Sequence, residues 1–156
     1  MPVNTIVSKG ISTGRYNIRM LTINDLVKDY DAVMSSVDRL NGVFGPNDTW
    51  PNGLTLEENL IDLGWHQKEF EIKSSFAFTV MSIDESKCLG CVYINPSSKV
   101  SFDAEIIMWV RQSEALSDLD SNLFATIKKW IKTDWWFTSV AFPGREITWE
   151  NWEKLP

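Results

Sequence analysis

The only histidine of the chain, His66, has two acidic neighbours at helical spacing. Asp62 lies four residues before it and Glu69 three residues after it, within a segment that reads as a helix. Carboxylates so placed would raise the pKa of the imidazole and orient it, which suits a general base. The alternative is a surface pair of ordinary helical side chains.

Two cysteines, Cys88 and Cys91, stand in a C-x-x-C arrangement. One such pair cannot complete a four-ligand zinc site, and His66 lies far away in the sequence. Residues three apart in a strand point to opposite faces, so the two thiols should diverge. We therefore expect two half-buried thiols and no metal site.

The stretch from Asp103 to Asp120 predicts a buried strand that runs through a loop into a helix. A helix N-terminus at that place is a common site for an anion. Asp118 and Asp120 instead favour capping of the helix by carboxylates, which would repel a phosphate. The alternative is a loop shifted in register, in which hydroxyl groups and cations bind the anion; its candidates are Ser113, Ser117, Ser121, Arg111 and Lys128.

Composition limits the class of protein. The chain has 156 residues, 44% of them hydrophobic, and a net charge of −6. These values predict one domain over residues 1–156, with residues 1–15 as a flexible lead-in, and argue against a nucleic-acid partner. No apolar run is long enough to span a bilayer and no signal peptide is evident, so we expect a soluble cytoplasmic protein without a membrane partner.

The elements that must position these residues follow from hydrophobic spacing. Strands are predicted near 16–22, 75–83, 88–96, 103–111 and 136–142, with helices over 22–40, 55–73, 119–133 and 148–155. Thr22 with Asp25, and Thr55 with Glu58, have capping spacing. The inward faces are expected to be Leu56, Leu60, Leu63 and Phe70 on the second helix, and Leu123, Phe124, Ile127, Trp130 and Ile131 on the third. The fold class is α+β.

This order of elements, with "LGCVYI" on one strand and "AEIIMWV" on the next, resembles the GNAT superfamily of acetyl-CoA-dependent N-acetyltransferases. The likeness covers roughly residues 16–142, and "DYDAVMSS", "LTLEENLIDLGWH" and "FPGREITW" are similar to a group of small bacterial GNAT-like proteins. It implies a mixed, mostly antiparallel sheet flanked by helices, here with a shortened C-terminal part. In the family a glycine-rich loop follows the fourth strand and binds the pyrophosphate of the cofactor; Ala115, Leu116 and Asp118 stand at its key positions here.

The resemblance also assigns roles. Glu105 stands where the family often keeps a catalytic glutamate; the alternative is an acid at the exposed end of a strand. His66 lies on a helix that often lines the acceptor site. The family's usual tyrosine acid lies on a helix after the fifth strand, where this chain has no tyrosine. By its chemistry Tyr93 could give a proton to the departing thiolate, the alternative being a packed tyrosine. The cofactor would contact Met108, Trp109, Val110, Arg111, Ser117 and Ser121.

Acceptor recognition should come from the "FGPNDTWPNG" loop, from the tryptophan-rich tail or from a partner subunit. The sequence thus predicts an N-acetyltransferase that uses acetyl-CoA on an unidentified amine of a small molecule or a protein. The alternative is a catalytically silent GNAT-like protein that binds a small ligand or a protein partner. An exposed sheet edge near Phe142 suggests a homodimer. Arg145 is expected to pair with Glu146, Glu150 or a ligand anion.

Overall fold

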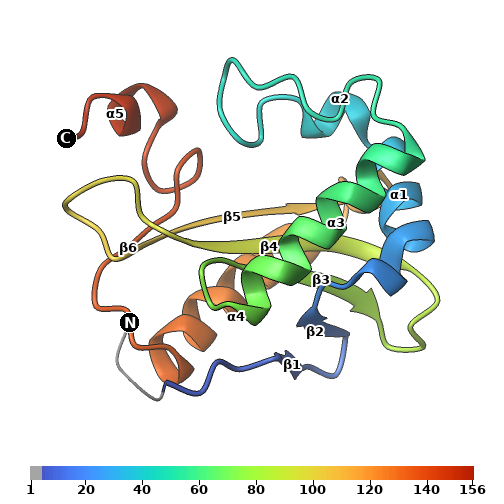
Figure 1. The fold of residues 1–156 in the computed structure, drawn as a ribbon, viewed down its shortest axis with the longest axis horizontal. Helices are drawn as coiled ribbons and strands as arrows, with labels where there is room; N and C mark the ends of the chain where they lie inside the picture. The colour runs from blue at the N-terminus through green and yellow to red at the C-terminus, as the bar shows by residue number, and fades with distance from the viewer. Residues whose placement is uncertain (1–4) are drawn as a thin grey trace.

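The computed structural model describes residues 5–156, and its centre is one six-stranded sheet (Figure 1). The strands lie side by side in chain order, and all neighbours are antiparallel except β5 and β6, which are parallel. They are β1 (Gly10–Ser12), β2 (Tyr16–Met20), β3 (Phe76–Ser82), β4 (Cys88–Pro96), β5 (Ala104–Val110) and β6 (Val140–Ala141).

Helices cover both faces of the sheet, with α3 in front and α4 behind it in the view of Figure 1. The helical segments are η1 (Ile23–Asp25), α1 (Leu26–Met34), α2 (Val37–Leu40), α3 (Leu56–Glu71), η2 (Gln112–Glu114), α4 (Leu119–Asp134) and α5 (Trp149–Glu153). No helix among the residues described is long and apolar enough to cross a membrane.

β5 separates two hydrophobic cores because its side chains alternate between the faces of the sheet. Ile106, Met108 and Val110 belong to the core that contains α4, whereas Ile107 and Trp109 belong to the core that contains α1. The predicted inward face of α4 is confirmed: Leu123, Ile127, Trp130 and Ile131 are buried together with Leu119, and Phe124 is half-buried.

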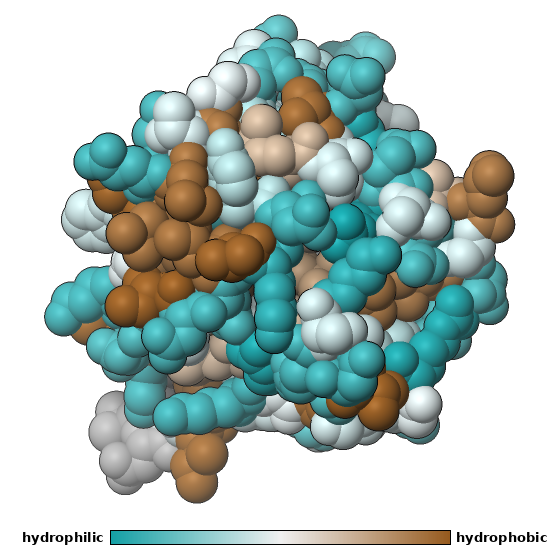
Figure 2. All heavy atoms as spheres, turned by 90° about the vertical axis from the view of Figure 1, so that its right-hand side faces the viewer, coloured by the Kyte–Doolittle hydropathy of each residue, from teal (hydrophilic) through white to brown (hydrophobic). Residues whose placement is uncertain are grey.

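The predicted inward face of α3 is wrong at its first two positions. Leu56 and Leu60 are 46% and 41% exposed, and the buried residues are Asn59, Leu63 and Phe70. Figure 2, which looks from the side of α1, shows apolar groups gathered at one side of a largely hydrophilic face. The face of α3 that meets the sheet therefore carries polar side chains, while some of its apolar side chains remain in solvent.

A β-bulge in β4 overturns the prediction that the two thiols diverge. Val80 pairs with Gly90 and Met81 with Cys88, so Leu89 is an extra residue on β4. The extra residue turns Cys88 back to the face of Cys91, and both thiols are fully buried in the core that contains α1. They are therefore neither diverging nor half-buried.

Both ends of the chain differ from prediction. The expected flexible lead-in contains β1, whose residues pair with β2 at Gly10↔Arg19 and Ser12↔Asn17; residues 1–4 lie outside the described part. The expected strand over 136–142 shrinks to β6 because Asp103 accepts hydrogen bonds from the amides of Thr138 and Ser139. These bonds hold the preceding residues outside the sheet.

β5 and β6 pair only at Ala104↔Val140 and Glu105↔Ala141. Beyond Glu105 no described strand pairs with the outer edge of β5. Side chains contact its carbonyl groups there instead: Arg39 donates to the oxygen of Val110 at 3.0 Å and Arg145 to that of Met108 at 3.3 Å. The two strands thus separate toward the N-terminus of α4.

Candidate active site

His66 lies on the inward side of α3, at the wall of a pocket of about 290 Å³. The N-cap of the helix is Thr55, whose hydroxyl accepts from the amide of Glu58 at 3.1 Å, as the capping spacing predicted. From that start, Asn59, Leu63 and His66 share one helix face. The pocket is lined by Leu21, Asp29, Phe44, Asp48, Trp50, Asn59, Asp62, Leu63, His66 and Tyr93.

The pocket is acidic and aromatic. Three of its lining residues are aspartates, Asp29, Asp48 and Asp62, and none of the described residues that line it is a lysine or an arginine. Burial raises the pKa of Asp29, and it also raises that of Asp62, which the neighbouring His66 lowers in part. A cavity with this charge and with ring faces favours a cation over an anion.

Burial lowers the pKa of His66 below its usual value, although Glu69 and Asp62 act in the opposite direction. The predicted increase is therefore wrong, because the loss of solvent around a side chain that is only 34% exposed outweighs two partly screened carboxylates. Glu69 approaches no closer than 4.0 Å to Nδ1. The imidazole is thus neutral near pH 7 and able to accept a proton.

Tyr93, on β4, lies opposite His66 in the pocket, with the two ring centroids 5.5 Å apart. Its hydroxyl accepts a hydrogen bond from Nε1 of Trp109 at 3.1 Å. Burial raises the pKa of Tyr93 well above its usual value, and the neighbouring Cys91 and Asp29 raise it further. The phenol is therefore a protonated group beside a neutral imidazole, so two of the three predicted catalytic residues lie together.

The loop between α2 and α3 closes the pocket with aromatic rings. Phe44 contacts both Trp50 and Tyr93 at centroid distances of 5.2 Å, and Trp50 lies 6.3 Å from Trp109. Asp48 is held in this loop by accepting from the amide of Trp50 at 2.8 Å. The "FGPNDTWPNG" loop thus supplies Phe44, Asp48 and Trp50 to the lining, and its part in acceptor recognition stays a prediction.

Glu105 lies away from this pocket. Its carboxylate accepts from the amide of Ser98 at 3.0 Å and from the Ser98 hydroxyl at 3.1 Å, which fixes the turn between β4 and β5. It is not among the residues that line the pocket of His66. A catalytic role for Glu105 stays a prediction, and its observed contacts are those of an acid at the end of a strand.

A second cavity, of about 330 Å³, opens where β5 and β6 separate. Ile107 and Met108 of β5 line it together with Pro143, Gly144, Arg145 and Trp149 on one side and Arg39, Asn41, Gly42 and Val43 on the other. Among the described residues no carboxylate lies within an ion-pair distance of Arg39. Two guanidinium groups thus face this opening.

The aspartates at the start of α4 are paired with arginines. The prediction that Asp118 caps the helix with its side chain is wrong, because its carboxylate lies 2.7 Å from the guanidinium of Arg15. Asp120 accepts two hydrogen bonds of 2.7 Å from Arg145, which overturns the predicted pairing of Arg145 with Glu146 or Glu150. Arg145 lowers the pKa of Asp120, and the more distant Arg39 contributes to the same shift.

Other predicted cofactor contacts are used inside the protein. Arg111 is buried and donates to the carbonyl of Cys88 and to Asp31, both at 3.0 Å. The Ser117 hydroxyl donates to Glu114 and accepts from the amide of Leu119, while that of Ser121 donates to the carbonyl of Asp118. These contacts contradict a role for Arg111, Ser117 and Ser121 as free donors to a cofactor.

The cleft between β5 and β6 fits an anionic cofactor through its arginines and not through its loop. The loop before α4 offers no glycine and uses its hydroxyl groups internally. Arg39 and Arg145 supply the type of donor that binds phosphate oxygens in pairs, and both already touch the β5 edge. Asp120 must release Arg145 before that guanidinium can bind a phosphate.

The cleft and the acidic pocket are neighbours on the sheet. Tyr93 of the pocket and Ile107 of the cleft are partners in the β4–β5 ladder, and both belong to the core that contains α1. The segment Val43–Phe44 separates the two cavities, since its first residue lines the cleft and its second lines the pocket. The two cavities therefore lie on either side of this segment, over adjacent strands of the sheet.

The sequence interpretation missed Asp29, Asn59 and Arg39 as residues of these cavities. The inward face of α3 could have been identified from a helical spacing of three to four residues, which Asn59, Leu63, His66 and Phe70 share. The partners of Arg39 and Asp29 lie far away along the chain, so no local pattern points to them.

Comparison with known proteins places the fold. No family model and no curated protein matches the chain. Among solved structures, the ribosomal-protein-S5-alanine acetyltransferase from Vibrio fischeri is 14% identical, with a TM-score of 0.61 over 80% of this chain and 67% of that one. RimL, a ribosomal L7/L12 α-N-protein acetyltransferase in complex with coenzyme A, is 14% identical, with a TM-score of 0.63 over 81% of this chain and 70% of that one. A GnaT-family acetyltransferase from Bordetella pertussis is 10% identical, with a TM-score of 0.59 over 81% of this chain and 73% of that one. The chain therefore has the fold of the GNAT acetyltransferases, as its sequence predicted.

Proposed function

We propose that this protein is an N-acetyltransferase that transfers an acetyl group from acetyl-CoA to a small amine. One observation supports this most strongly: a neutral histidine and a protonated tyrosine lie in an acidic, aromatic pocket beside the cleft that separates β5 from β6. The shared fold with acetyltransferases supports the class of reaction.

The acceptor is an amine because the pocket selects its ammonium form. Asp48 and Asp62 attract the positive charge, and the faces of Phe44, Trp50 and Tyr93 add a cation–π contribution of about 1 kcal/mol. The pocket volume of about 290 Å³ limits the bound part to a small group. An amine bound there must lose a proton before it can attack a carbonyl.

His66 is the base for that proton. Its pKa is lowered, so the imidazole is unprotonated at neutral pH, and it lines the same pocket as the carboxylates that attract the amine. Tyr93 keeps its proton and is the acid available for the departing thiolate. His66 first passes the proton of the ammonium form to solvent. The nitrogen then forms its bond to the acetyl carbon as the carbon–sulfur bond breaks, His66 takes the second nitrogen proton, and Tyr93 gives its proton to the departing thiolate. Transfer of a proton from the imidazolium to the Tyr93 phenolate restores both side chains.

Arg39 and Arg145 would hold the phosphates of acetyl-CoA, whose thioester supplies the acetyl group. Both side chains reach the β5 edge from opposite sides of the cleft. They take the place of the glycine-rich loop that the family uses. The carbonyl groups of Met108 and Val110 then become available to other donors.

A steady-state assay tests this proposal. Purified protein is incubated with acetyl-CoA and a panel of primary amines, and the released CoA thiol is measured against a reaction without amine. We expect amine-dependent thiol release that disappears in His66→Gln. Equal release with and without every amine would contradict transfer.

A second candidate function is binding of a small amine without acetyl transfer. It is favoured by the Arg145 side chain, which bridges Asp120 and the carbonyl of Met108 inside the cleft. This function predicts amine binding in calorimetry with no heat from acetyl-CoA. The acetyltransferase proposal predicts binding of both the amine and acetyl-CoA.

A further inference from the structure

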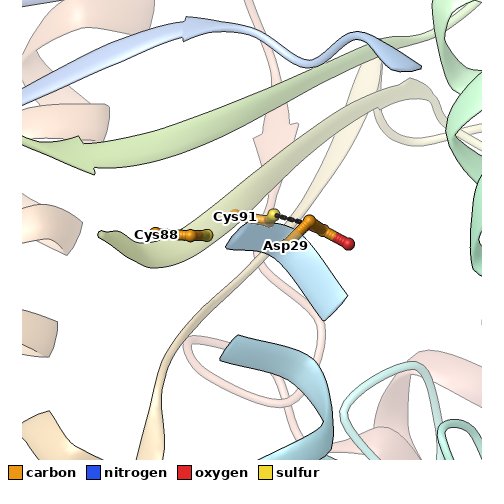
Figure 3. Close-up of side chains that lie close together, drawn as sticks. All are labelled: Asp29, Cys88 and Cys91. Carbon is orange, nitrogen blue, oxygen red and sulfur yellow. Dashed lines mark hydrogen bonds between the residues drawn. The ribbon is translucent and has the colours of Figure 1, made fainter. Parts of the chain in front are cut away.

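We infer that Asp29, Cys88 and Cys91 form a binding site for a thiophilic divalent cation of the Zn²⁺ type. One carboxylate oxygen and the two sulfur atoms all lie within 4.8 Å of one another, and all three side chains are buried (Figure 3). This inference is independent of acetyl transfer, because it rests on a different group of atoms.

The fold builds the cluster from two elements. The bulge at Leu89 places both sulfur atoms on the face of β4 that α1 covers. Asp29, in the first turn of α1, points onto that face, and the thiol of Cys91 donates to its Oδ1 at 3.5 Å. Figure 3 shows the side chains of the two cysteines on the same stretch of β4 with Asp29 against Cys91.

The donor set suits zinc. Two thiolates and a carboxylate are ligands that Zn²⁺ accepts in tetrahedral sites, with Zn–S near 2.3 Å and Zn–O near 2.1 Å. Ligand atoms around such an ion are about 3.5 Å apart, which is the distance already found between Cys91 and Asp29. Cys88 completes the set after a shift of about 1 Å at most, given the 4.8 Å limit on the cluster.

The surroundings hold the ligands in place. The amide of Asn59, itself 2% exposed, donates to Oδ2 of Asp29 at 2.9 Å and leaves Oδ1 facing Cys91. The hydroxyl of Thr79 lies 3.5 Å from the sulfur of Cys88. Such outer hydrogen bonds fix the orientation of metal ligands.

The ion can reach the site and be neutralised there. Asp29 also lines the pocket of His66, so the carboxylate of the cluster borders that pocket, and a fourth position on this side would be open to water or a ligand. Binding of one Zn²⁺ displaces one proton from each thiol into solvent, and the two thiolates balance the charge of the ion.

Cobalt titration of the metal-free, reduced protein tests the site. We expect a thiolate-to-cobalt charge-transfer band in the near ultraviolet that saturates at one Co²⁺ per chain and is removed by one equivalent of Zn²⁺. Cys91→Ser should weaken the band and the Cys88→Ser, Cys91→Ser double variant should abolish it. Asp29→Asn should weaken Zn²⁺ binding at least tenfold in competition with a chelating dye. Asp38→Asn, which changes an exposed acid outside the pocket and the cluster, should leave the affinity unchanged.

The wild-type titration by itself can overturn the inference, so failure of a variant to fold does not rescue it. Folded, reduced wild-type protein that shows no charge-transfer band up to millimolar Co²⁺ would contradict the site. Unchanged Zn²⁺ affinity in a folded Cys88→Ser, Cys91→Ser double variant would do the same. Neither measurement involves acetyl-CoA, so its outcome is separate from that of the proposed activity.

Discussion

The guanidinium of Arg145 donates to both carboxylate oxygens of Asp120 at 2.7 Å, across the opening between β5 and β6. The pair joins the turn after β6 to the first turn of α4. Its side chains are only 26% and 31% exposed, so solvent screens it in part. Any anionic ligand of Arg145 must therefore compete with the carboxylate of Asp120 for its guanidinium group.

Asp120→Asn should tighten acetyl-CoA binding about fivefold, since removal of a partly screened like charge is worth on the order of 1 kcal/mol. Arg145→Gln should weaken it at least tenfold. Calorimetric titration of each variant measures both effects, with Glu146→Gln, whose partner is Lys128, as the control. Tighter binding by Arg145→Gln would show that Arg145 blocks the cleft.

His66→Gln should lower kcat at least 100-fold and leave the Kd for acetyl-CoA unchanged. Loss of a general base typically costs this much, and His66 lines the acceptor pocket and not the β5–β6 cleft. Lys68→Gln, on the exposed side of the same helix, is the matched control. A kcat within threefold of wild type would remove His66 from the mechanism.

The lowered pKa of His66 predicts a pH dependence of stability. The pKa of the imidazole is below 6.5 in the folded protein and near 6.5 in the unfolded chain. As the pH falls through 6.5, the unfolded state therefore takes up a proton first, and this stabilises the unfolded state. The free energy of unfolding of wild type minus that of His66→Gln should therefore decrease between pH 6.5 and the folded pKa. Urea melts at several pH values give this difference; a difference that grows as the pH falls would contradict the burial of His66.

Asp62→Asn should raise KM for the amine about tenfold with little change in kcat. The carboxylate attracts the ammonium group at long range, while His66 performs the proton transfer. Asp38→Asn, on the exposed side of α2, is the control. An equal effect of both substitutions would mean that overall charge, and not this pocket, attracts the amine.

The sequence predicted those features that depend on neighbours along the chain. The capping box of Thr22 and Asp25, the inward face of α4 and the two-sided burial of β5 follow from local spacing, and the structure confirms them. Three of the failures depend on distant partners. The face of Cys88 is set by register against Met81, and the roles of Arg111 and Arg145 are set by Asp31 and Asp120.

The two cavities could be predicted only in part. His66, Tyr93 and the loop over 44–53 were identified from residue type and position, but Asp29 and Asn59 read as ordinary helix residues. Their polar side chains are buried because they bond to each other at 2.9 Å, a contact between residues 30 positions apart. A hydrogen bond of this kind leaves no periodic signal in one sequence.

Gly90→Ala should destabilise the fold far more than Gly64→Ala. A Cβ at Gly90 would lie 2.1 Å from the carbonyl oxygen of Trp109, so the backbone of β4 or β5 must move. A Cβ at Gly64 meets only a side-chain methyl group at 3.9 Å, and alanine should stabilise that helix by about 0.5–1 kcal/mol. Thermal melts of the two variants measure the contrast, and similar melting temperatures would contradict the close packing of β4 against β5.

Calorimetric titration with acetyl-CoA, and separately with CoA, tests the central claim most directly. The account predicts saturable binding of one molecule per chain that depends on Arg39 and Arg145, and a rise in melting temperature of several degrees at about 100 times the Kd. No heat and no shift at 1 mM of either ligand would contradict acetyl transfer and leave a GNAT fold that binds an amine alone.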